Sequence, residues 1–90
     1  MPKAVVDPEE LRRFAIELKR FSGDLKERIS GIHHHFVKLG ETWQDQEHAK
    51  FAETFEQVVR ALAQFADAGE KYIPFLLRKA ESIQAYLDQR

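Results

Sequence analysis

The second half of this chain carries residues that recur every seven positions from residue 48 to residue 87, and this pattern limits the fold more than any other feature. One row holds His48, Phe55, Leu62, Gly69, Leu76 and Ile83. A second row holds Ala52, Val59, Ala66, Ile73, Ala80 and Leu87, and a third holds Phe51, Val58, Phe65, Tyr72, Lys79 and Tyr86. A sustained seven-residue repeat is typical of a long helix packed along other helices. We therefore predict a helix over about residues 46–88.

The first half of the chain shows a helical pattern of its own. Asp7 can cap a helix start, and Pro8 fits the first helical turn. Steps of three and four residues then separate the apolar positions Leu11, Phe14, Leu18, Phe21, Leu25, Ile29, Ile32, Phe36 and Leu39. This spacing predicts a helix over about residues 8–39. Gly40 follows it directly and can adopt the left-handed conformation that often ends a helix.

A short connector, about residues 40–45, has the length expected between antiparallel helices. Asp45 is a good cap for the second helix, and Thr42 is an alternative cap that leaves the boundary open by a few residues. Trp43 is the single tryptophan, and we expect its indole to cover the end of the seam between the helices. A tryptophan at such a tip also suits an interface hot spot. The predicted turn motif is therefore Gly40, Trp43 and Asp45.

Pro74 interrupts the second pattern without shifting its phase. Because proline removes a backbone hydrogen bond and clashes with the preceding turn, we predict a kink near residues 70–74. The alternative is a full break at Gly69 that starts a separate third helix. The predicted fold class is all-α: an antiparallel hairpin of two long helices, the second kinked near Pro74, in a single domain of residues 1–90.

Helix lengths predict a partner. At 1.5 Å per residue the helices would be about 48 Å and about 64 Å long, so the last dozen residues of the second would overhang. Two helices cannot cover three adjacent rows, and an exposed apolar patch marks an interface. We therefore predict pairing into a four-helix bundle, as a homodimer or a heterodimer with a similar hairpin. The predicted core and interface positions are Phe51, Phe55, Val58, Leu62, Phe65, Tyr72, Leu76 and Ile83.

Composition excludes several classes of function. The net charge of −1 offers no cationic field for nucleic acid, and no apolar run approaches the roughly 18 residues of a membrane span. The start lacks the apolar segment of a cleavable signal peptide, which predicts a cytoplasmic protein or one secreted without such a signal. No residues pair a nucleophile with a base, and no phosphate-binding loop occurs. We expect a non-enzymatic protein without cofactors.

The run His33, His34 and His35 is the most conspicuous candidate for metal chemistry. Consecutive helical residues point about 100° apart, so the three rings cannot converge on one ion. The useful spacing His-x-x-x-His is absent, although His48 could approach one of them across the turn. We predict no metal site, and the run is interpreted as a structural cluster or a pH-sensitive patch. The segment from Glu41 to Glu56 is acidic, and one interpretation left open is that it forms a docking surface for a basic partner.

Two amphipathic helices joined by a tryptophan-containing turn resemble the WXG (ESAT-like) family of type VII secretion. The resemblance covers roughly residues 8–88 and includes Leu39 four positions before Trp43, with Phe51, Phe55 and Leu62 after it. It implies antiparallel hairpins that pair as homodimers or heterodimers into four-helix bundles. It also implies small export substrates, or carriers that present a partner to a membrane secretion ATPase. Cofactors and catalytic residues are not part of the family.

Two departures from the family pattern bear on the function. Asp45 stands where the motif has glycine, a mild change because both residues are accepted as helix N-caps. The family's export signal resembles Tyr-x-x-x-Asp/Glu, whereas Tyr72 is followed by Leu76 and Tyr86 by Arg90. The alternative that a partner chain carries the export signal is therefore left open. The predicted function is a substrate or pairing partner of a type VII-like secretion system; the alternative is a cytoplasmic interaction or scaffold module unrelated to secretion.

Overall fold

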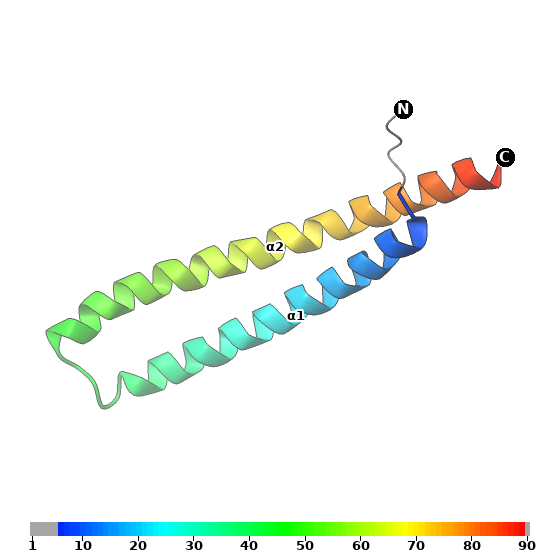
Figure 1. The fold of residues 1–90 in the computed structure, drawn as a ribbon. Coiled ribbons are helices and arrows are strands. Elements are labelled where there is room, and N and C mark those ends of the chain that lie inside the picture. The colour runs from blue at the N-terminus through cyan, green and yellow to red at the C-terminus, as the bar shows by residue number, and fades with distance from the viewer. Residues whose placement is uncertain (1–5, 90) are drawn as a thin grey trace.

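The structure, a computed structural model, describes residues 6–89 and contains two long helices in that range. Helix α1 spans Pro8–Leu39 and helix α2 spans Gln46–Asp88. They fold back on each other as an antiparallel hairpin, and α2 continues beyond the start of α1 (Figure 1). The all-α hairpin predicted from the sequence is therefore confirmed. The further pairing into a four-helix bundle stays a prediction.

Each helix begins at an aspartate whose carboxylate accepts a backbone hydrogen bond. Asp7 accepts from the N–H of Glu9 at 2.9 Å, and Asp45 accepts from the N–H of His48 at 3.0 Å. Such bonds satisfy amides that have no carbonyl partner in the first turn. The hydroxyl of Thr42 instead donates to the carbonyl of Leu39 at 3.3 Å. Asp45, and not Thr42, is therefore the cap of α2.

The prediction that Gly40 adopts a left-handed conformation is wrong. Gly40 has φ −61° and ψ −15°, and no residue between 6 and 89 has a positive φ. The right-handed turns continue beyond the helix, because the N–H of Thr42 and the N–H of Trp43 both donate to the carbonyl of Leu39. What limits position 40 is close approach: an added Cβ would lie 3.2 Å from the carbonyl oxygen of Val37 and 3.6 Å from Nε2 of His48.

Helix α2 is continuous through both Gly69 and Pro74. The alternative of a third helix that starts at Gly69 is therefore wrong, because the helical packing against α1 outweighs the lost hydrogen bond at the proline. The size of the predicted kink stays a prediction. Within the residues that the structure describes, neither helix is long and apolar enough to span a membrane.

Small side chains form the most buried part of the contact between the helices. Ala15 and Ser22 of α1 are buried, as are Ala66 and Ala80 of α2. Next to them, a Cβ added at Gly69 would lie 3.1 Å from Oγ of Ser22, so the backbones approach closely there. The remaining seam positions of α1 are half-buried: Leu11, Leu18, Leu25, Ile29, His33 and Phe36.

The stripe predicted on α1 was therefore too wide. Phe14, Phe21, Ile32 and Leu39 are exposed on the flank of the seam instead of lying inside it. The reason is that Ala15 and Ser22, on the neighbouring face of α1, are small enough to let the two helices approach closely. Phenylalanine side chains at those positions would hold the helices apart. Ala15 and Ser22 therefore face α2 in the seam, and the larger side chains lie on the exposed flank.

The difference between the glycines gives a stability test. A Cβ at Gly23 would meet nothing within 4 Å, so Gly23→Ala is expected to stabilise the protein by about 1 kcal/mol through helix propensity alone. The same substitution at Gly69 pushes against buried Ser22 and should lose that gain or destabilise. Urea unfolding of both variants measures the two effects. Equal stabilisation by both would contradict the close approach of the helices at Gly69.

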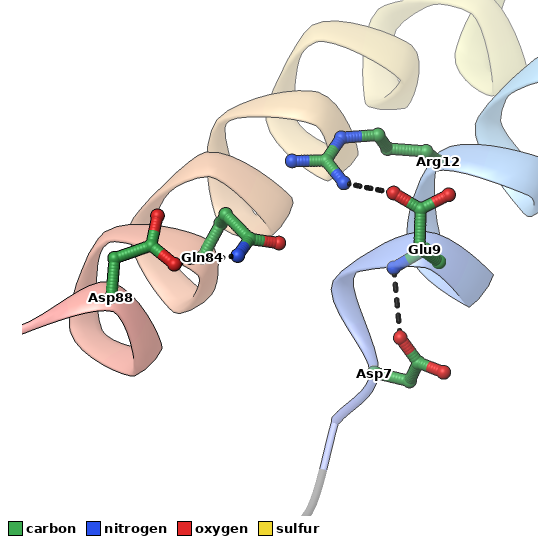
Figure 2. Close-up of polar contacts among 5 residues, drawn as sticks. All are labelled: Asp7, Glu9, Arg12, Gln84 and Asp88. Carbon is green, nitrogen blue, oxygen red and sulfur yellow. Dashed lines mark hydrogen bonds and ion pairs between the residues drawn. The ribbon is translucent and has the colours of Figure 1, made fainter. Parts of the chain in front are cut away.

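The polar contacts drawn at the open end of the hairpin lie within each helix or at its cap (Figure 2). Arg12 forms an ion pair with Glu9 at 2.6 Å, one turn earlier on α1. On α2, Nε2 of Gln84 donates to Oδ1 of Asp88 at 3.0 Å. Exposed pairs of this kind contribute only tenths of a kcal/mol, so they do not fix the helices to each other.

Candidate protein–protein interface

One side of the hairpin is lined by large apolar side chains that the chain itself does not cover. Their exposed fractions lie between 39% and 62%. The rings of Phe21 and Phe65 meet edge to face at 6.5 Å between centroids, which shows that the α1 and α2 rows share one side of the molecule. We call this surface the apolar face, and it comprises Phe14, Phe21, Ile32, Leu39, Phe51, Val58, Leu62, Phe65 and Tyr72.

The opposite side carries the polar contacts that cross between the helices. Nζ of Lys26 lies 2.5 Å from a carboxylate oxygen of Glu70 and 2.9 Å from one of Asp67. Lys26 follows Phe21 by five residues, and Glu70 follows Phe65 by five, so each points about 140° from the apolar face. Hydrogen bonds to Glu70 and then to Asp67 raise the pKa of Lys26 above its ordinary value.

A second crossing contact lies nearer the turn. Nε2 of His33 is 3.1 Å from Oε1 of Glu56, which makes His33 a structural member of the histidine run. His34 and His35 do not join it, and no group of three metal-ligating side chains occurs within residues 6–89. The polar side is thus linked by the chain itself, whereas the apolar face is left without comparable contacts.

Aromatic rings gather where the two helices meet the turn. Phe36 stacks on His48 at 5.3 Å and on Phe55 at 4.4 Å between ring centroids. The indole of Trp43 packs edge-on against His48 at 5.0 Å and lies 6.0 Å from Phe51. These five residues form the tip cluster. Trp43 is half-buried in it, so the indole lies against the first turn of α2.

The backbone geometry at Asp45 explains why this turn does not need glycine. Asp45 has φ −93° and ψ −177°, an extended conformation that any residue adopts. The N–H of His48 lowers the pKa of the Asp45 carboxyl below its ordinary value, and the indole of Trp43 and the N–H of Glu47 act in the same direction. The charged carboxylate therefore supports the helix start, in agreement with its place at the positive end of α2.

A lowered pKa in the folded state predicts how acid affects stability. The contribution of Asp45 is present above its unfolded pKa and is lost as the pH falls through the folded value. An asparagine side chain at this position would keep a capping oxygen that does not titrate. The melting temperature of Asp45→Asn is therefore expected to approach that of the wild type as the pH falls from about 6 to about 2. A constant difference between the two melting temperatures would contradict this role.

The structure separates the predicted core and interface residues into two groups. Phe55, Leu76 and Ile83 are half-buried along the seam. Phe51, Val58, Leu62, Phe65 and Tyr72 lie on the apolar face. Phe14 and Phe21, which were placed in the α1 stripe, join the apolar face as well. Their exposed position depends on which column of α1 faces α2, a choice that the sequence steps of three and four leave open.

The apolar face is hollowed near the turn-side half of α1. The groove there has a volume of about 460 Å³. Its lining is mainly apolar and also includes Arg28 and His35. The lining residues are Leu25, Arg28, Ile29, Gly31, Ile32, His35 and Leu62. The groove thus offers space for an apolar side chain together with positive charge beside it.

Comparison with known proteins identifies similar sequences and structures. The family model WXG100, described as proteins of 100 residues with WXG, matches residues 5–89. Wild-type EsxB, a secreted protein from Bacillus anthracis strain Sterne, is 27% identical, with 93% of this chain and 97% of that chain covered and a TM-score of 0.76. Its selenomethionine form is also 27% identical, with 96% and 98% covered and a TM-score of 0.77. No curated protein matches the chain significantly.

Proposed function

This chain belongs to the WXG100 family, and from that premise we propose that it acts as an export substrate whose apolar face is covered by another helical hairpin. It is an ESAT-like small helical protein of type VII secretion. Proteins of this family are non-enzymatic and typically pair with another hairpin. The observation that supports the pairing most strongly is the exposure of nine large apolar side chains on one side of a hairpin whose other side is linked by its own charges.

The dimensions of the hairpin suit such a pairing. It extends 68 Å by 24 Å and is one helix thick, at 15 Å. A stable interface buries about 800 Å² on each partner, which a face of this size accommodates easily. Leaving phenylalanine and tyrosine rows in water would promote unspecific association. Burial of the face would join the two hairpins in a single core, so the stability of the hairpin would depend on its partner.

The similarity to EsxB supports export of the folded pair. EsxB is described as secreted, and the similarity covers nearly the whole of both chains. Because Tyr72 and Tyr86 lack an acidic residue four positions later, the spacing of the family's export signal does not occur at either tyrosine. We propose that the protein acts by binding alone, and that it leaves the cell as a type VII export substrate.

Export is tested by following the protein in a strain with an active type VII system and in the same strain without the secretion ATPase. The expected result is accumulation in the medium of the first strain only. Co-expression with neighbouring genes forms a second arm, which detects a signal carried by another chain. Retention in the cells of both strains under both conditions would contradict the proposal and favour a cytoplasmic scaffold.

A further inference from the structure

The contacts that join the two helices are distributed unevenly along the hairpin. Lys26 of α1 pairs with Asp67 and Glu70 of α2, and the other ion pairs and ring contacts between the helices involve α2 residues nearer the turn. Within residues 6–89, no ion pair, side-chain hydrogen bond or ring contact joins α1 to the part of α2 beyond Glu70. These links therefore end at Glu70, although α2 continues to Asp88.

The part of α2 beyond Pro74 packs on α1 with little buried surface. We call residues 75–88 the arm, which runs along the beginning of α1 and past it (Figure 1). Ala80 is its one buried residue, and Leu76 and Ile83 are only half-buried. A segment with few buried apolar contacts has a low free energy of local opening. The arm is therefore the part of α2 that separates from α1 most easily.

The backbone next to the arm is the weakest part of the hydrogen-bond ladder of α2. Pro74 lies inside the helix and has no N–H to donate to the carbonyl of Glu70. Gly69 precedes this gap, and glycine is the least favourable helix residue after proline. Helices bend at such positions because fewer hydrogen bonds oppose the motion. We call residues 69–74 the hinge.

Lys26 anchors the hinge to α1. Its Nζ lies 2.9 Å from a carboxylate oxygen of Asp67 and 2.5 Å from one of Glu70, which stand on either side of Gly69. The close approach of Gly69 to buried Ser22 adds a packing contact at the same level. The base of the hinge is thus held on α1 by charge and by packing, whereas the arm has only its thin seam.

We propose that the arm is a conformational device that opens from α1 as a rigid helical unit about the hinge, while Lys26 keeps the rest of α2 in place. Opening exposes Leu76, Ala80 and Ile83. The open arm presents these side chains together with Phe75, which is exposed already. A ligand that binds only the open arm would shift the population toward it. This inference goes beyond the proposed function, because it depends neither on export nor on the second hairpin.

Hydrogen–deuterium exchange of the whole chain, followed by mass spectrometry, tests whether the arm opens as a unit. After correction for intrinsic exchange rates, the amides of the arm are expected to exchange at similar rates, at least about tenfold faster than those of residues 50–66. The change should occur as a step at the hinge. Ordinary fraying of a helix end gives instead a gradual increase toward the last residue of α2. A gradual increase, or equal protection on both sides of the hinge, would overturn the proposal.

Pro74→Ala restores the missing N–H and tests whether the hinge causes the opening. The arm of this variant should exchange at least about tenfold more slowly than that of the wild type, and the step should disappear. The matched control is Gln64→Ala, an exposed change on the same helix, which should leave the step in place. A step that persists in Pro74→Ala, or that disappears in both variants, would overturn the role of the hinge.

Lys26→Gln tests the anchor. Because the ion pairs to Asp67 and Glu70 are lost, rapid exchange is expected to extend from the hinge toward residue 60, with rates there about threefold higher. Lys19→Gln, an exposed change on the same helix as Lys26, should leave these amides unchanged. Equal exchange in Lys26→Gln and the wild type would overturn the anchoring role of Lys26. Circular dichroism checks that every variant remains helical.

Discussion

Replacing Phe65 by aspartate is expected to weaken pairing by about three orders of magnitude, the largest effect that a single change on the apolar face should have. Phe65 is 62% exposed in the single hairpin, so the hairpin itself does not need this ring for its seam. If the apolar face is the interface, as we propose, this position lies between the two hairpins. A carboxylate there would be buried without a partner, which costs roughly 3–5 kcal/mol.

The control for this substitution is Gln64→Asp, which adds the same charge at the adjacent, exposed position on the outer side of α2. Sedimentation equilibrium should find the control paired and Phe65→Asp mainly monomeric. Because folding and pairing are linked, the monomer should also melt at a lower temperature. Wild-type affinity in Phe65→Asp would show that the apolar face is not the interface.

Phe36→Ala is expected to destabilise the hairpin by about 3–5 kcal/mol, as truncation of a packed phenylalanine does. Phe36 is the α1 member of the tip cluster, and its ring lies 4.4 Å from that of Phe55 and 5.3 Å from that of His48. Its loss would remove the aromatic contact that joins the end of α1 to the beginning of α2. Chemical unfolding measures the change in free energy.

The neighbouring Val37 is a suitable control because it is mostly exposed. Val37→Ala should change the free energy of unfolding by about 0.5 kcal/mol or less. Trp43→Ala should loosen the tip while most of the helicity remains, since the aromatic neighbours of the indole, His48 and Phe51, belong to the first turns of α2. A loss of stability at Phe36→Ala no larger than that at Val37→Ala would contradict the tip cluster as a structural element.

The long repeat of α2 was readable because its period matches a helix that stays in contact over its whole length. Asp7 and Asp45 were equally readable, since capping depends on local chemistry alone. The exposed position of Phe14 and Phe21 could not be predicted from the sequence. Steps of three and four describe two neighbouring columns equally well, and the small size of Ser22 opposite Gly69 decides between them.

Contacts that depend on the alignment of the two helices could not be predicted either. The ion pair of Lys26 with Glu70 and the contact of His33 with Glu56 join residues that no local pattern relates. The groove on the apolar face arises in the same way, because Leu62 of α2 completes a hollow formed by α1. At Gly40, the usual preference of glycine for a left-handed helix end gave way to further right-handed turns.

The mass of the purified protein in solution tests the central claim most directly. Sedimentation equilibrium from micromolar to millimolar concentration, on the protein alone and after co-expression with adjacent genes, is predicted to give a helical species of two hairpins, which for a homodimer has twice the 10.5 kDa chain mass. Its dissociation on dilution should be accompanied by a loss of stability. A well-folded monomer of 10.5 kDa over the whole range, both alone and after co-expression with adjacent genes, would contradict the account, because the apolar face would then remain in water without a partner.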